Sequence, residues 1–132
     1  MDNKTFLDFL PSNFRHEKLF LTKNNLDDFT KLSNLKDSEL NQIIKCSPFC
    51  TLNNLKKIRA ISIFNTSIKT TPYESYLLLH CGIGSVKTLA KLNPSEVKER
   101  IGRLERSLGT KTQTKISLSL LKSWINKAKN NF

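Results

Sequence analysis

One glycine-containing turn between two short helical patterns constrains the fold of this chain more than any other feature. An apolar run at residues 77–79 precedes Gly82-Ile83-Gly84, and the apolar residues between 86 and 90 recur at the spacing of one helix face. Gly82 suits a left-handed residue that ends the first helix, because glycine has no Cβ, and Ser85 suits the N-cap of the second. The sequence therefore predicts a helix, a tight turn and a second helix within residues 76–101.

The same unit contains signals for where other helices begin. Asn93-Pro94-Ser95-Glu96 predicts a third helix, with Asn93 as its cap, Pro94 at the first helical position and Glu96 reaching back as in a capping box. Thr71-Pro72-Tyr73-Glu74 has the same arrangement. It predicts that the unit begins at residue 71.

A weaker copy of the unit lies earlier in the chain. Adding 57 to each position carries residues 19–44 onto 76–101 without a gap, and apolar residues then match apolar residues at the core positions. Asn25 takes the place of Gly82, and asparagine tolerates a left-handed conformation better than most residues. We interpret this register as an internal duplication.

Each copy is followed by a further helical pattern, and no alternating pattern of useful length predicts a strand. Apolar residues recur every three positions from Leu52 to Phe64, whereas Gly109 ends one predicted helix and residues 117–128 form the apolar stripe of the last. We therefore expect an all-α fold of about eight short helices in two pseudo-equivalent halves within one compact domain. The expected parts are an N-terminal arm (1–18), a first unit with a degenerate hairpin (19–64), a polar linker (65–70) and a second unit (71–129).

Positive charge is concentrated in the later part of the chain. The formal net charge is +11; residues 1–45 carry seven basic and seven acidic side chains, whereas residues 46–132 carry fifteen basic and four acidic ones. Such asymmetry favours a polyanionic partner, although a solvated basic face explains it equally well. The sequence offers neither a membrane-spanning segment nor a secretory signal, so we expect an intracellular, soluble protein. Its bias toward Asn, Lys and Ile is compatible with an AT-rich bacterial or plastid genome, so the expected compartment is a bacterial cytoplasm or a plastid stroma.

The chain resembles a tandem helix-hairpin-helix family, the one catalogued as domain of unknown function 4332. The resemblance is carried by Gly82-Ile83-x-Ser85-Val86-x-x-Leu89-Ala90 with Asn93-Pro94, by Ser123-Trp124-Ile125-x-x-Ala128-Lys129, and more weakly by Asn25-Leu26-Asp27-Asp28-Phe29-x-x-Leu32. It implies a fold that commonly holds the backbone of duplex nucleic acid without reading its bases. No activity is implied by the family.

The second hairpin is the candidate site for phosphate. Backbone amides at a glycine turn and at the following helix start can form an anion-binding nest. In the first hairpin Asp27 and Asp28 stand where Gly84 and Ser85 stand in the second, so carboxylates would repel phosphate there. The candidate residues of the second hairpin are Gly82, Ile83, Gly84, Ser85, Lys87 and Lys91.

The last helical pattern adds four lysines to the candidate site. They recur at spacings of four and seven, which predicts one side of a helix, opposite a stripe containing Trp124. The alternative is the solvated face of an amphipathic helix, and Trp124 itself fits a core residue better than a base-stacking platform. These lysines are Lys111, Lys115, Lys122 and Lys129.

Other chemistry has little support in the sequence. Cys46, Cys50 and Cys81 cannot all pair with one another, and together with His80 they leave a zinc site conceivable, although free thiols explain them better. No catalytic motif is present. We therefore expect a non-enzymatic module without a cofactor that binds nucleic acid, most simply duplex DNA, independently of sequence. The alternative is a protein-interaction adaptor without a nucleic-acid role.

Overall fold

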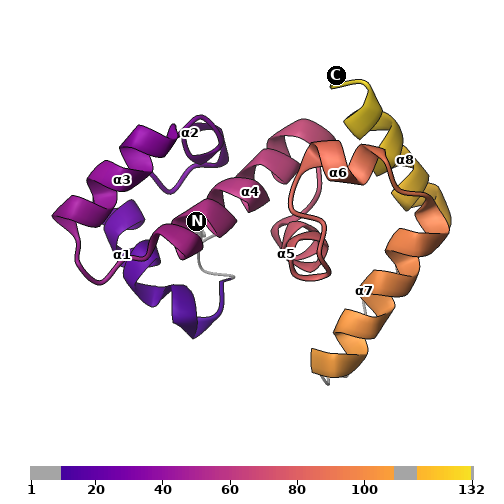
Figure 1. Cartoon of the computed structure of the whole chain (residues 1–132), viewed down its shortest axis with the longest axis horizontal. Helices are drawn as coiled ribbons and strands as arrows, with labels where there is room; N and C mark the ends of the chain where they lie inside the picture. The colour runs from indigo at the N-terminus through magenta and orange to yellow at the C-terminus, as the bar shows by residue number, and fades with distance from the viewer. Residues whose placement is uncertain (1–9, 109–115, 132) are drawn as a thin grey trace, which may run out of the picture.

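A computed structural model describes residues 10–108 and 116–131, and these residues form helices, turns and loops with no strand. The expectation of an all-helical fold is confirmed. A 3-10 turn at Ser12–Phe14 precedes eight α-helices (Figure 1), which are α1 (Arg15–Lys23), α2 (Phe29–Ser33), α3 (Asp37–Cys46), α4 (Leu52–Ile68), α5 (Pro72–His80), α6 (Val86–Ala90), α7 (Pro94–Leu108) and α8 (Leu118–Lys129).

The long helix α4 runs through the middle of the molecule. Figure 1 shows α1–α3 at one end of α4 and α6–α8 at the other, with α5 between them. The part of α4 up to Ile61 contributes Ile58 and Ile61 to a core shared with α1–α3, and the part after Ile61 contributes Phe64 and Ile68 to a core shared with α5–α8. One helix therefore supplies apolar side chains to both cores.

The start of α4 is held by a buried carboxylate from α1. Glu17 is only 1% exposed, and its carboxylate accepts hydrogen bonds from the backbone N–H of Thr51 (2.8 Å) and from Nδ2 of Asn54 (3.2 Å). The hydroxyl of Thr51 in turn accepts the N–H of Asn54. Because the first N–H groups of a helix lack partners within the helix, these bonds fix α4 against α1.

The turns that follow α1 and α5 share one hydrogen-bonding pattern. Asn25 (φ 58°) and Gly82 (φ 94°) are both left-handed, as expected. Ile83 donates its N–H to the carbonyl of Leu78 (3.1 Å), and the corresponding bond 57 residues earlier joins Leu26 to Leu21 (2.8 Å). This bond, spanning six residues, is characteristic of a Schellman ending, in which a left-handed residue turns the chain away from the helix axis.

Two helix boundaries differ from the expected division of the chain. Helix α1 begins at Arg15, within the expected arm, and α4 continues to Ile68, through most of the expected polar linker. The hydroxyl of Thr66 donates to the carbonyl of Ser62, one turn earlier, and Ile68 is fully buried. Polar composition was therefore a poor indicator of a linker here, because short hydroxyl side chains can bond within a helix.

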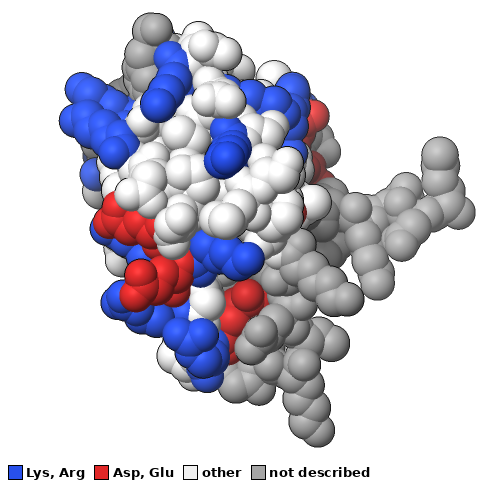
Figure 2. Space-filling model, turned by 90° about the vertical axis from the view of Figure 1, so that its right-hand side faces the viewer, with Lys and Arg blue, Asp and Glu red and all other residues white. Residues whose placement is uncertain are grey.

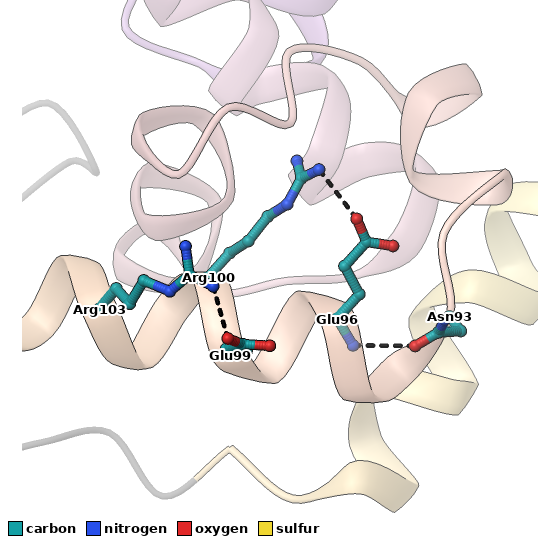
Figure 3. Close-up of polar contacts among 5 residues, drawn as sticks. All are labelled: Asn93, Glu96, Glu99, Arg100 and Arg103. Carbon is teal, nitrogen blue, oxygen red and sulfur yellow. Dashed lines mark hydrogen bonds and ion pairs between the residues drawn. The ribbon is translucent and has the colours of Figure 1, made fainter.

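One of the two expected capping boxes is only half formed. Thr71 and Glu74 exchange both bonds of the box at the start of α5. At the start of α7 the side chain of Asn93 accepts the N–H of Glu96 (2.8 Å), but the Glu96 carboxylate accepts from Arg100 (3.0 Å) instead of reaching back (Figure 3). The guanidinium one turn ahead offers a charged donor, which competes with the backbone N–H of Asn93.

No helix in the described ranges is both long and apolar enough to cross a bilayer.

Candidate nucleic-acid interface

The backbone amides of the second hairpin divide into two groups. Gly82 donates its N–H to the carbonyl of Leu79 (3.3 Å), and Ile83 donates to Leu78 (3.1 Å). The expectation that these two amides point outward is therefore wrong, because a Schellman ending uses the N–H groups of both residues after the helix. The side chain of Ile83 is also fully buried in the second core.

The next four amides remain available. Among the described residues, no acceptor takes the N–H of Gly84, Ser85, Val86 or Lys87, whereas the N–H of Thr88 bonds to the hydroxyl of Ser85 (3.1 Å). Gly84, Ser85 and Lys87 are exposed to solvent. The candidate nest therefore begins at Gly84, two residues later than the sequence suggested.

The first hairpin already carries an anion at the equivalent place. The carboxylate of Asp28 accepts the N–H groups of Thr30 (2.7 Å) and Lys31 (3.2 Å), and Nζ of Lys31 donates to the carbonyl of Asn25 (3.0 Å). Two N–H groups at this helix start thus already have an acceptor within the chain. The carboxylate expected at this helix start is in place, and the difference in phosphate affinity between the two hairpins stays a prediction.

Helix α4 forms the opposite wall of a groove at the second hairpin. The groove has a volume of about 250 Å³, and its two walls come from residues 56–64 of α4 and residues 84–86 of the turn. Lys56 is exposed at this groove. Arg59 also lines it, but its guanidinium donates to the carbonyl of Leu35 (3.1 Å) and pairs with Asp37 (2.8 Å).

The sequence did not identify Lys56 as a candidate. It stands between apolar positions of a predicted helix, which is where solvated lysines are ordinarily found. Its position at the groove depends on how α4 crosses the second hairpin, about 28 residues further along the chain. No local pattern encodes that crossing.

The predicted lysines are only partly brought together. Lys87 and Lys91 are exposed on α6 and just after it, and Lys122 and Lys129 are exposed on α8, which packs against α6. Helix α8 begins at Leu118 with Ser117 as its N-cap, and of the four predicted lysines it carries Lys122 and Lys129. Lys111 and Lys115 lie outside the described residues. Trp124 is buried in the second core, in agreement with the core interpretation.

The surface at the α7–α8 end is mixed in charge. Figure 2 shows Lys and Arg side chains around a largely uncharged area, with Asp and Glu side chains among them toward the lower part of this face. On α7 two acids are paired with a basic residue one turn further on, Glu96 with Arg100 and Glu99 with Arg103 (Figure 3). The hydrogen bond from Arg103 lowers the pKa of Glu99. These pairs reduce the free positive charge of α7.

The cysteines and His80 are distributed over both halves. Cys46 is exposed, Cys50 is buried beside the hydroxyl of Ser47 (3.3 Å), and the thiol of Cys81 donates to the carbonyl of Leu78 (3.3 Å). Burial raises the pKa of both Cys50 and Cys81. Within residues 10–108 and 116–131, no three His, Cys, Asp or Glu side chains are grouped as metal ligands would be.

These features define an all-helical protein. The groove between α4 and residues 84–86 is called the hairpin groove below. The chain belongs to the family described as a domain of unknown function (DUF4332), whose model matches residues 11–131. No curated protein and no solved structure is significantly similar to it.

Proposed function

We propose that this protein is a tandem helix-hairpin-helix module that binds nucleic acid, most simply duplex DNA, without reading sequence and without catalysis. The repeat is supported by the bounds of the helices. Helices α1 and α5, and likewise α2 and α6, begin and end 57 residues apart. The turn between the helices of each pair contains a left-handed residue and the same six-residue hydrogen bond.

The observation that carries the binding proposal is the groove at the second hairpin. Four adjacent amides at residues 84–87 have no acceptor among the described residues, and Lys56 lies at the same groove on α4. Lys87 and Lys91 follow the amides on exposed positions. A phosphodiester needs N–H donors together with nearby positive charge, and phosphate contacts position a protein on a duplex without specifying bases.

A salt titration on a random-sequence DNA duplex tests this proposal. Three or four phosphate contacts predict a plot of log affinity against log salt with a slope of about −3 to −4. The affinity should not depend on the sequence of the duplex. A slope near zero, or a strong sequence preference, would contradict binding through the phosphate backbone.

The substitution Gly84→Asp tests the hairpin itself. A Cβ at Gly84 meets no atom within 4 Å, and the first hairpin carries Asp27 at the equivalent position, so the fold should tolerate the change. The new carboxylate should lower DNA affinity by at least tenfold, which is about 1.4 kcal/mol.

Matched variants separate a local effect from a change in net charge. Asp27→Asn removes a charge at the first hairpin, and it should leave the affinity unchanged or slightly higher. Lys56→Ala with Lys87→Ala should flatten the salt slope by about two, whereas Lys36→Ala with Lys45→Ala, in the first half, should change it little. If Gly84→Asp binds DNA as the wild type does, the hairpin is not a phosphate site.

The second candidate function is a protein-interaction adaptor. The observation that favours it is the first hairpin, where Asp28 satisfies the helix start and leaves no phosphate site. One hairpin that has lost phosphate binding is compatible with a fold used for another purpose. Undetectable DNA binding by the wild-type protein at low salt would favour this function.

A further inference from the structure

The end of the molecule formed by α1 and the α3–α4 connection carries an exposed apolar groove. Leu19 and Phe49 are 68% and 70% exposed, the highest values among large apolar side chains in the described ranges. Together with Phe20 they line a groove of about 550 Å³. Exposed apolar area of this kind commonly marks a binding surface.

The groove is held open by contacts across its two walls. The ring of Phe49 stacks on that of His16, with centroids 5.3 Å apart. Next to it, the thiol of Cys50 contacts the carbonyl of His16 (3.6 Å) and the hydroxyl of Ser47 (3.3 Å). These contacts join the 47–50 turn to α1, so that a ligand meets a site that is already formed.

The charged residue that lines the groove is basic. Lys23 contributes to one wall, and no carboxylate among the described residues lines it. Helix α1 also carries Arg15, and its only acid, Glu17, is buried and accepts hydrogen bonds from the start of α4. A second copy of the chain would therefore bring like charges together across the groove. An acidic partner would bring opposite charges together.

We propose that this groove docks an acidic, amphipathic segment of a partner protein, with large apolar side chains between Leu19 and Phe49 and carboxylates facing the basic residues of α1. The groove is lined by α1 and the α3–α4 connection, and these elements lie at the end of the molecule opposite α6–α8 (Figure 1). It is thus separate from the hairpin groove, and a module that holds nucleic acid at one end could hold a protein at the other. The inference does not depend on nucleic-acid binding.

A selection from a phage-displayed library of random peptides tests the proposal without assuming a sequence. The library is selected on the wild-type protein after depletion on Leu19→Ser/Phe49→Ser, whose altered side chains are mostly exposed and should leave the fold intact. Enriched peptides should combine aromatic or leucine residues with a net negative charge. Titration of the most enriched peptide should show at least about tenfold weaker binding to the double variant.

Controls decide between this occupant and others. Leu118→Ser removes an exposed leucine on α8 and should bind the peptide as the wild type does. Far-UV circular dichroism should show that both variants are folded. Enrichment of uncharged or basic peptides, or no enrichment, would overturn the proposal. A wild-type dimer in sedimentation that Leu19→Ser/Phe49→Ser converts to monomer would overturn it too, because the groove would then hold a second copy.

Discussion

Gly82 and Gly84 are two residues apart and meet different constraints. Gly82 has a φ of 94°, which side chains rarely adopt, whereas no left-handed φ is found at Gly84. Gly82→Ala should therefore lower the free energy of unfolding by about 1–2 kcal/mol. The nearest atom to the new Cβ, on Arg100, is 3.7 Å away, so backbone strain and not a clash is the cause. Urea titration measures the loss.

Gly84→Ala is the matched control for that loss. It should change stability by less than about 1 kcal/mol, since its surroundings are open. Equal losses at Gly82 and Gly84 would contradict a special role for the left-handed conformation.

His80 makes stability dependent on pH. Its Nε2 is buried with no hydrogen-bond partner among the described residues, and its ring lies 4.2 Å from that of Tyr76. Burial, and secondly the charge of Lys57, lowers the pKa of His80 from its usual 6.5. Below that value the unfolded chain takes up a proton more readily than the folded one, so stability should fall as the pH decreases from about 7 to below 6.5.

A comparison with His80→Phe isolates this contribution. The phenyl ring keeps the contact with Tyr76 but cannot titrate, so thermal unfolding of the variant should depend less on pH over the same window. Every other group is the same in both proteins, so its contribution cancels in the difference. Parallel pH curves for the two proteins would show that His80 does not contribute.

The roles of single residues could be predicted from the sequence where they depend only on the neighbouring backbone. A glycine or asparagine at a turn and a Ser or Thr before a helix each report on neighbouring backbone, and Asn25, Gly82 and Ser85 take their expected roles. The free amides were misplaced by two residues. The cause is that the Schellman hydrogen bonds use the N–H groups of Gly82 and Ile83. The composition of a turn does not reveal which of its amides are hydrogen-bonded within the chain.

Among the elements, α4 depends on a distant side chain for its first turn. Removing the carboxylate in Glu17→Ala leaves the N–H of Thr51 without its acceptor and leaves Nδ2 of Asn54 with only the carbonyl of Asn13, and it should cost about 2–3 kcal/mol. The equivalent residue 57 positions later, Glu74, accepts the N–H of Thr71 within its own helix start. Glu74→Ala should cost less than about 1 kcal/mol.

Chemical denaturation of the two variants provides the comparison. Similar losses for Glu17→Ala and Glu74→Ala would mean that burial adds nothing to the capping role of Glu17.

Most helices were predictable because their caps and periodicity are local. The length of α4 was not, since its last turn is polar in sequence and is held by the buried Ile68. The hairpin groove was not predictable for a related reason. It depends on the packing of α4 beside residues 84–86, and a single sequence contains no direct record of which helices cross.

At the scale of the whole molecule, α4 supplies side chains to both cores, so the two halves should unfold in a single transition. Leu40 is fully buried in the first core, and Leu40→Ala should cost about 2–5 kcal/mol. Trp124, the only tryptophan, lies in the second core and reports on that half by fluorescence. The fluorescence transition should shift to lower denaturant by as much as the helical transition seen by circular dichroism.

Two separated transitions, with the tryptophan signal unmoved by Leu40→Ala, would show that the halves unfold independently.

The shared core also affects the order in which the chain can fold as it leaves the ribosome. Tyr76 and Leu79 of α5 pack against the core formed by α1–α4, although they belong to the second half of the sequence. Proteins are made from the N-terminus at about 5–20 residues per second, and early segments often fold before later ones exist. Here the first core stays open on one side until α5 has emerged. Nascent chains that end at Ile68 should therefore remain sensitive to protease, and chains extended past His80 should gain protection in the first half.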